Sequence, residues 1–251
     1  MFNKIAGKIF GMNNEKGFSL LELIVVIIII GVLSLVAVEN FSGSVEISRQ
    51  NETIAEMEEL KKALIGDSDL IEDGIRTDFG FIGDTGSIPS NALFQGDILR
   101  VSVIGGWRGP YMSVDFQSDD YLKDAWGELY VLDPSAMTIY SPGLDRTIVL
   151  GNTSSQMLLN QVRIIITDRQ GYTPKTADLG NIQVSLTLRN GTTLPLQPVG
   201  SGGLCTISSV PVGIHDLTVT HTVLGETVPK RVVVYPGVTA GPIEIKFTAL
   251  P

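Results

Sequence analysis

Cysteine, histidine and positive charge are scarce in this sequence of 251 residues. The one cysteine, Cys205, has no partner for an intrachain disulfide, and two histidines, His215 and His221, leave little for a zinc site. The chain has 18 Lys and Arg against 27 Asp and Glu, a net charge of −9, so it offers no positive field to a phosphate backbone. These shortages argue against a disulfide scaffold, a zinc protein and a nucleic-acid-binding protein.

What the sequence does have is one long apolar run near its start. No charged residue occurs from Leu23 to Val38, and Glu22 is the one charge between Phe18 and Val38. A helix of this length spans about 31 Å, close to the thickness of a bilayer core. The run predicts a single membrane span over about residues 18–38. The flank before it has Lys4, Lys8 and Lys16 against Glu15, which predicts a cytoplasmic N-terminus and an exported C-terminus.

A helical pattern continues after the apolar run. Apolar residues recur at intervals of three and four among acidic and basic ones, at Val38, Phe41, Val45, Ile54, Met57, Leu60 and Leu64. This spacing is typical of an amphipathic helix with one buried face. We therefore expect one helix over residues 18–66, half of it in lipid and half packed on a domain.

The segment before the run is Lys16-Gly17-Phe18-Ser19-Leu20-Leu21-Glu22. It resembles the class III signal of type IV prepilins and of the pseudopilins of type II secretion. The resemblance implies a leader over residues 1–17, cleavage by prepilin peptidase between Gly17 and Phe18, and methylation of the new amino terminus. Many members of that family have proline where this chain has Glu39, so no proline kink is expected there, and any helix melting in an assembled filament is expected at residues 42–44, Ser-Gly-Ser, instead.

Glu22 needs a physical reason, because an ionisable residue inside a span costs roughly 2.5–3.5 kcal/mol on insertion scales. Cleavage would free an amine at Phe18, four residues away, and the Glu22 carboxylate could pair with that amine in its own subunit or in a neighbour. Such a pair would fix the axial register of packed helices. The alternative is an idle charge at the headgroup level of a plain signal anchor.

Residues 67–150 have the composition of a small globular head, with turns rich in Gly, Asp, Ser and Pro between short apolar segments. Segments 105–111, 124–130 and 139–145 resemble the head of major pseudopilins, which implies a small antiparallel sheet. Four aromatic residues are expected in the core and turns: Trp107, Tyr111, Trp126 and Tyr130. Asp145 is the one carboxylate in residues 143–155, too few for the six to eight oxygens of calcium, so we predict no metal.

A polar linker is expected over residues 151–160, and an all-β sandwich over residues 161–251. Five alternating, β-branched segments punctuated by Gly and Pro turns predict strands, at 162–166, 182–188, 217–220, 231–235 and 243–247. Residues 204–219 resemble the carboxypeptidase regulatory-like or transthyretin-like module, in which a strand, a Val-Pro-x-Gly turn and a second strand recur in noncatalytic domains.

No residue pattern indicates catalysis or a cofactor. His215 and His221 would share one face of a strand about 20 Å apart, too far for a common metal, and we expect them at the surface or rim. Cys205 has no setting that would lower its pKa, so it is expected as a small strand residue rather than a nucleophile. No nucleophile elbow marks a serine.

The sequence therefore predicts an α+β protein: a long N-terminal transmembrane and amphipathic helix, a small pilin-like head and a β-sandwich. Its resemblances imply a structural subunit of a type IV pilus-like or type II secretion pseudopilus filament. They also imply its partners: copies of itself, prepilin peptidase, a platform protein with its ATPase, other minor pilins or pseudopilins, and the bacterial inner membrane. The alternatives are a pilin-anchored adhesin that acts through the sandwich and, with less support, a membrane-anchored enzyme.

Overall fold

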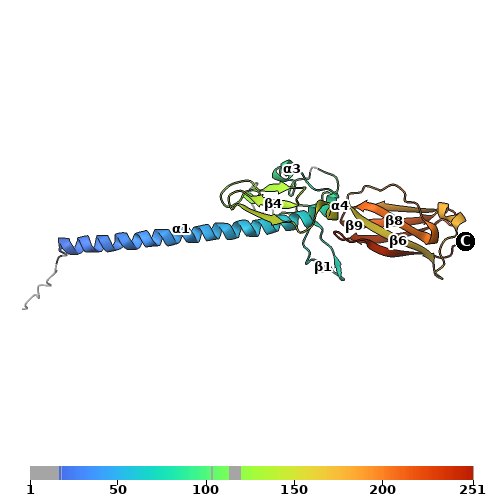
Figure 1. The fold of residues 1–251 in the computed structure, drawn as a ribbon, viewed down its shortest axis with the longest axis horizontal. Coiled ribbons are helices and arrows are strands. Elements are labelled where there is room, and N and C mark those ends of the chain that lie inside the picture. The colour runs from blue at the N-terminus through green and yellow to red at the C-terminus, as the bar shows by residue number, and fades with distance from the viewer. Residues whose placement is uncertain (1–16, 18, 103, 113–119, 251) are drawn as a thin grey trace, which may run out of the picture. The chain divides into compact units, whose positions relative to one another are not determined.

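The computed structural model describes residue 17 and residues 19–102, 104–112 and 120–250. The chain divides into two compact units, Met1–Ser48 and Arg49–Pro251. Helix α1 (Leu20–Ile65) contributes to both units, and the second unit holds the strands of the described residues (Figure 1). The fold is thus mixed, with an N-terminal helix and a β-rich C-terminal region, as the sequence predicts.

Helix α1 closely matches the helix expected over residues 18–66. It ends at Gly66, whose N–H donates to the Lys62 carbonyl at 2.7 Å and whose φ of +83° is left-handed. A Cβ at this position would lie 2.5 Å from the Asp78 carbonyl oxygen, so glycine alone fits there. In this single chain the helix continues through residues 42–44, where the Ser42 hydroxyl donates to the Val38 carbonyl at 3.0 Å. One glycine costs about 1 kcal/mol, which the flanking helical turns offset.

The C-terminal part of α1 packs as the amphipathic pattern predicts. Met57, Leu60 and Leu64 are fully buried in a core shared with the head. The Tyr130 hydroxyl donates to the Glu56 carboxylate at 2.7 Å and ties the helix to the head by a polar contact as well. In the first unit, Val38 and Phe41 of this pattern are exposed and Val45 is half-buried.

The head contains a three-stranded antiparallel sheet, as the resemblance implies. Its strands are β3 (Val131–Asp133), β4 (Thr138–Ser141) and β5 (Arg146–Val149), in the order β3-β4-β5. The inward residues Ile139 and Ile148 face each other across β4 and β5. The remaining head elements are short: β1 (Ile71–Glu72), β2 (Ile75–Arg76), α2 (Gly80–Thr85), α3 (Asn91–Gln95) and the 3₁₀ turn η1 (Asp120–Leu122).

Residues 151–160, expected as a linker, contain the short helix α4 (Ser154–Leu158). Thr153 and Gln156 form a reciprocal capping box, in which each side chain accepts from the other's backbone N–H, at 3.2 and 3.0 Å. Met157 is buried in the head core. This segment therefore adds apolar contact to the head.

The C-terminal region consists of two three-stranded sheets. One has the order β10-β9-β7, from β7 (Ile182–Thr187), β9 (Gly213–His221) and β10 (Glu226–Val234). The other has the order β11-β6-β8, from β6 (Asn160–Asp168), β8 (Leu204–Val210) and β11 (Ala240–Phe247). The 3₁₀ turns η2 (Thr176–Asn181) and η3 (Ser201–Gly203) lie between strands. Each of the five strand segments expected from the sequence overlaps one of these strands, although β9, β10 and β11 begin three to five residues earlier than expected.

One apolar cluster takes its members from all six strands, among them Ile164 of β6, Leu186 of β7 and Phe247 of β11. Two of the pairings are unlike a simple meander: β11 runs parallel to β6, and β7 pairs with β9 rather than with β8. Strand-length patterns predict that these segments are extended, but they do not determine which edges pair.

Candidate functional site

The expected processing and assembly residues lie at the start of α1. Gly17 is exposed and outside the helix, whereas Phe18 lies outside the described residues. The Ser19 hydroxyl accepts from the Glu22 N–H at 3.2 Å, and the Ser19 carbonyl accepts from the Leu23 N–H at 3.1 Å. Ser19 thus caps the helix, which places Glu22 in the first turn, where a carboxylate favours the helix dipole.

An apolar surface covers every side of α1 directly after this turn. From Leu20 to Leu35 the large apolar side chains are exposed, with fractions from 44% to 80%. They are Leu20, Leu21, Leu23, Ile24, Val25, Val26, Ile27, Ile28, Ile29, Ile30, Val32, Leu33 and Leu35. Full burial of each would contribute roughly 1.5–3 kcal/mol, so this segment, the apolar segment 20–35, requires a partner.

The membrane span predicted over residues 18–38 is not found: no helix within the described part of the chain is long and apolar enough to cross a membrane.

The two histidines are buried, so the prediction that they lie at the surface or rim is wrong. Both lie on the inward face of β9, where His215 is 1% and His221 0% exposed. They share this face with Leu217 and Val219, because every second residue of a strand points to the same side. His221 Nε2 lies 2.7 Å from Asp178 Oδ2, and its Nδ1 accepts from a backbone N–H. Polar partners thus make burial of the rings possible. The expectation that they share a strand face is confirmed.

The other residues weighed for chemistry have structural positions. Cys205 is 3% exposed on β8, and burial raises the pKa of its thiol to about 11, which disfavours the thiolate. Asp145 accepts a hydrogen bond from the Tyr140 hydroxyl at 3.0 Å. No group of three or more His, Cys, Asp or Glu side chains within the described ranges could hold a metal ion.

The four aromatic residues expected in the core and turns of the head lie in or beside its core. Tyr130 is fully buried, and Trp107, Tyr111 and Trp126 are half-buried. Trp107 Nε1 donates to the Ile98 carbonyl at 2.8 Å. These contacts agree with the structural role expected for them.

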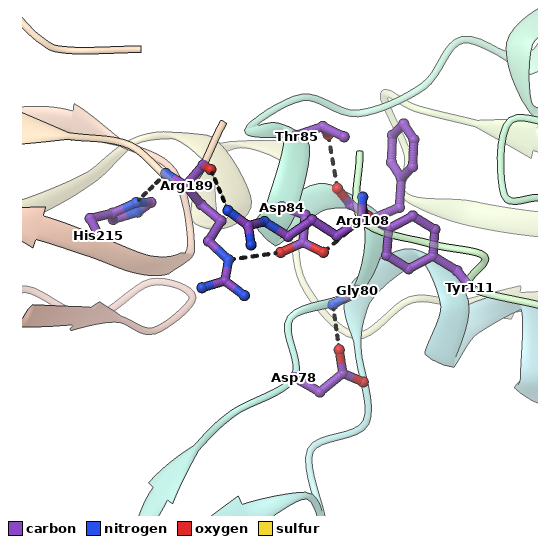
Figure 2. A network of polar contacts seen from close by, with 9 residues as sticks. Asp78, Gly80, Asp84, Thr85, Arg108, Tyr111, Arg189 and His215 are labelled. Carbon is purple, nitrogen blue, oxygen red and sulfur yellow. Dashed lines mark hydrogen bonds and ion pairs between the residues drawn. The ribbon is translucent and has the colours of Figure 1, made fainter. Parts of the chain in front are cut away.

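A polar network connects the head with the C-terminal region, and its central ion pair of Asp84 and Arg189 was not singled out from the sequence (Figure 2). At its centre is Asp84 of α2. Its Oδ1 lies 3.2 Å from Arg189 Nε, and its Oδ2 accepts from the Tyr111 hydroxyl at 3.0 Å. Arg189 follows β7, so this ion pair joins two residues that are 105 positions apart in the chain.

The neighbours of Arg189 extend this network. His215 Nδ1 accepts from the Arg189 N–H at 3.2 Å, and His215 Nε2 donates to the Pro211 carbonyl at 2.8 Å. Burial lowers the pKa of His215, which keeps the ring neutral and able to accept. Asn190 Nδ2 donates to the Thr85 carbonyl at 2.9 Å. The network therefore fixes the turn after β7 against α2.

Comparisons with known proteins bear on the N-terminal segment. The family model of the prokaryotic N-terminal methylation motif matches residues 12–38. No curated protein matches the chain. Two solved structures show similarity. The Bacillus anthracis TIE protein has a TM-score of 0.29 and 14% identity over 36% of this chain and 16% of that chain. BcpA, the major pilin subunit of Bacillus cereus, has a TM-score of 0.27 and 12% identity over 43% of this chain and 35% of that chain.

Both TM-scores are too low to indicate a shared fold, and the chain spans about a third or less of the length of either protein. The motif match is different in kind, because it covers the segment that contains Gly17, Glu22 and the apolar segment 20–35. Residues 12–38 therefore contain a prokaryotic N-terminal methylation motif of the prepilin type.

Proposed function

We propose that this protein is a structural subunit of a pilus-like or pseudopilus filament, assembled through the N-terminal half of α1. The observation that carries the proposal is the methylation motif over residues 12–38, which ends in a helix whose large apolar side chains are exposed on every side. A helix of this kind reaches a low free energy when copies of it pack together, because each then exchanges exposed apolar surface for contacts with its neighbours.

In this proposal a prepilin peptidase cuts after Gly17 and the leader, residues 1–17, is removed. Phe18 becomes the first residue of the subunit, and its amine lies one helical turn from Glu22. Within the described residues no ion pair is formed by the Glu22 carboxylate, so its proposed partner is this amine, of the same subunit or of its neighbour. A buried carboxylate without its cation costs roughly 3–5 kcal/mol, enough to select one axial register over others.

The precursor is proposed to wait in the bacterial inner membrane, with its N-terminus cytoplasmic and its head exported. A cytoplasmic ATPase acting through a platform protein then moves it into a periplasmic or cell-surface filament, with other minor pilins or pseudopilins as neighbours. Residues 18–66 would form the core of this filament. Residues 67–150 would form its head, residues 151–160 a connection, and residues 161–251 a closed β-sandwich on its surface.

The experiment compares three variants of the full chain expressed with an assembly system. Gly17→Asp should leave the precursor uncut, with a mass larger by the leader, because an aspartate side chain conflicts with a cleft that accepts an extended glycine. Glu22→Leu should be cut normally and yet enter filaments about tenfold less or worse, since the Phe18 amine then lacks its anion. Glu46→Leu, also exposed on α1, is the matched control and should leave cleavage and assembly unchanged.

Two outcomes would oppose the proposal at different levels. Normal filaments from the Glu22→Leu protein would refute the proposed charge pairing, but the proposal of assembly through apolar packing would stand. If the native protein is found to have an intact Met1, or an amino terminus beyond Leu35, the filament proposal as a whole is refuted.

A second candidate function is adhesion or ligand recognition through the C-terminal region, and the observation that favours it is the separate apolar core of that region. Deleting the region is a poor test, because Val212 belongs to the head core and would be lost. Exposed side chains far from the junction are better targets, namely Tyr172 and Val223, which are 69% and 71% exposed. Filaments of Tyr172→Ala with Val223→Ser that form normally but no longer attach would favour recognition, and normal attachment would oppose it.

A further inference from the structure

A cavity of about 310 Å³ lies where the head meets the C-terminal region. Its walls include Asp84, Arg108 and Tyr111 from the head and Arg189 from the turn after β7 (Figure 2). Two guanidinium groups from parts of the chain that are 81 residues apart therefore line the same hollow. Arginine is the side chain best suited to hold a carboxylate, because its planar donors match both oxygens at once.

The hydrogen bonds of these arginines leave donors for a ligand. Arg189 uses Nε on Asp84, and within the described residues its two terminal amino groups have no acceptor. Arg108 uses Nη2 on the Arg189 carbonyl at 3.4 Å, a long contact, and its other terminal nitrogen has no acceptor among the described residues. Three of the four terminal nitrogens therefore have no acceptor among the residues that the structure describes, and each is a charged donor that would gain from one.

The charged side chains that line the cavity are two carboxylates, Asp78 and Asp84, and two guanidinium groups, Arg108 and Arg189, and both carboxylates already accept hydrogen bonds. Asp84 pairs with Arg189, and its second oxygen is taken by Tyr111. Asp78 also lines the cavity, but its oxygens accept from the backbone N–H groups of Asp67 and Gly80, and Arg76 lies close enough to attract it. Arg108 therefore has no carboxylate of its own within the described part of the chain.

The acidic composition of the surrounding segment makes these unused guanidinium donors notable. Residues 49–159 contain 8 Lys and Arg against 18 Asp and Glu, a net charge of −10. In a segment so acidic, guanidinium groups with unused donors mark a place where an anion is stabilised rather than repelled.

We propose that this cavity binds a carboxylate group, held between Arg108 of the head and Arg189 of the C-terminal region. A single carboxylate would neutralise the unpaired guanidinium and accept from terminal nitrogens on both sides of the junction. The size of the cavity suits one acidic side chain, a chain-terminal carboxylate or a small free dicarboxylate. Because it would contact both parts at once, the ligand would stabilise the junction that Asp84 and Arg189 already form. This inference does not depend on the filament proposal.

The test measures thermal unfolding of the full-length chain in nonionic detergent, with malonate as the probe and sodium chloride at equal ionic strength as the reference. At ten times its dissociation constant, malonate should raise the unfolding temperature of the wild-type protein by about 3–6 °C. Arg108→Gln should remove this increment without disturbing the pair between Asp84 and Arg189. Arg231→Gln is the matched control, because Arg231 is exposed on β10 and outside the cavity, and it should keep the increment.

A second arm distinguishes a free ligand from a carboxylate of another copy of this chain. If a second copy supplies the group, the unfolding temperature without malonate should rise with protein concentration in the wild type and not in Arg108→Gln. The site is supported if malonate raises the unfolding temperature, or if the unfolding temperature rises with protein concentration, provided that the effect is lost in Arg108→Gln and kept in Arg231→Gln. The absence of both, or an equal effect in the two variants, would overturn it.

Discussion

Asp124 is the most heavily hydrogen-bonded carboxylate of the described head, and its replacement by asparagine tests how this loop is held. Its Oδ2 accepts from the Ser141 hydroxyl and the Gly143 N–H, both at 2.7 Å. Its Oδ1 accepts from the N–H groups of Trp126 and Glu128, both at 3.0 Å. The side chain is buried, with 4% of the residue exposed, so water does not replace these bonds.

Asparagine has the same shape but one acceptor oxygen, so Asp124→Asn can keep two of the four bonds and turns an amide N–H₂ toward the other two donors. Hydrogen bonds to a charged group contribute about 1.5–3 kcal/mol each. The loss of two gives a destabilisation of about 3 kcal/mol or more. For a chain of this size that corresponds to a decrease of about 6–12 °C in the unfolding temperature.

The effect has a predicted pH dependence. Burial alone would raise the pKa of Asp124, but the hydrogen bonds, first that from Ser141, outweigh it and lower the pKa below its ordinary value. The contribution of the carboxylate is therefore complete above the unfolded pKa of about 3.9 and is lost as the pH falls through the lower folded value. The difference between wild type and Asp124→Asn should be full at pH 7 and should shrink below about pH 4.

The assay is thermal unfolding in nonionic detergent, followed by near-UV circular dichroism, at pH 7 and at steps down to pH 3. Asp133→Asn is the matched control: both of its hydrogen bonds, from Ser135 and Ala136, go to Oδ1, which asparagine retains. Its effect should stay within about 0.5 kcal/mol. The reasoning is refuted if Asp124→Asn is no worse than Asp133→Asn, or if its effect does not change with pH.

Three further substitutions probe other contacts by the same unfolding assay. Gly203→Ala should destabilise by several kcal/mol more than Gly202→Ala, since both φ angles are about +70°, but at Gly203 a Cβ would clash with the Ile166 carbonyl oxygen of β6. Thr167→Val should stabilise by about 1 kcal/mol, because its buried hydroxyl has no hydrogen-bonding partner among the described residues. Tyr130→Phe should destabilise by about 1–2 kcal/mol through loss of the bond to Glu56.

Controls for these variants remove the same atoms at exposed positions. Thr220→Val removes a hydroxyl whose contact with Thr227 is exposed, and it should be neutral or slightly destabilising. Tyr172→Phe removes the hydroxyl of a side chain that is 69% exposed, and it should be neutral. A stabilising Thr220→Val equal to Thr167→Val, or a Tyr172→Phe as damaging as Tyr130→Phe, would contradict the burial argument.

Local patterns were enough for helix α1 and for five strands of the C-terminal region. The three- and four-residue spacing through Met57, Leu60 and Leu64 predicted the helix and its buried face, and alternation of β-branched residues predicted the strands of the C-terminal region. One local signal was missed: Thr153 and Gln156 have the spacing of a capping box, which would have identified α4 within the expected linker.

Contacts between distant segments were not predictable in this way. His215 and His221 were expected at the surface or rim, yet β9 has both neighbouring strands beside it and its inward face is enclosed. The cavity residues Arg108 and Arg189 show no common motif, and nothing in their spacing marks them as neighbours.

The amino-acid sequence by itself determined the N-terminal segment, because the methylation motif, Glu22 and the apolar run act through residues within a few helical turns of one another. The tertiary structure alone decided that β11 runs parallel to β6, that both histidines are buried, and that Asp84 meets Arg189. The physical reason is that periodicity and capping depend on neighbours in the chain. Strand pairing and a bridging carboxylate depend instead on which distant backbones come together when the apolar faces are buried.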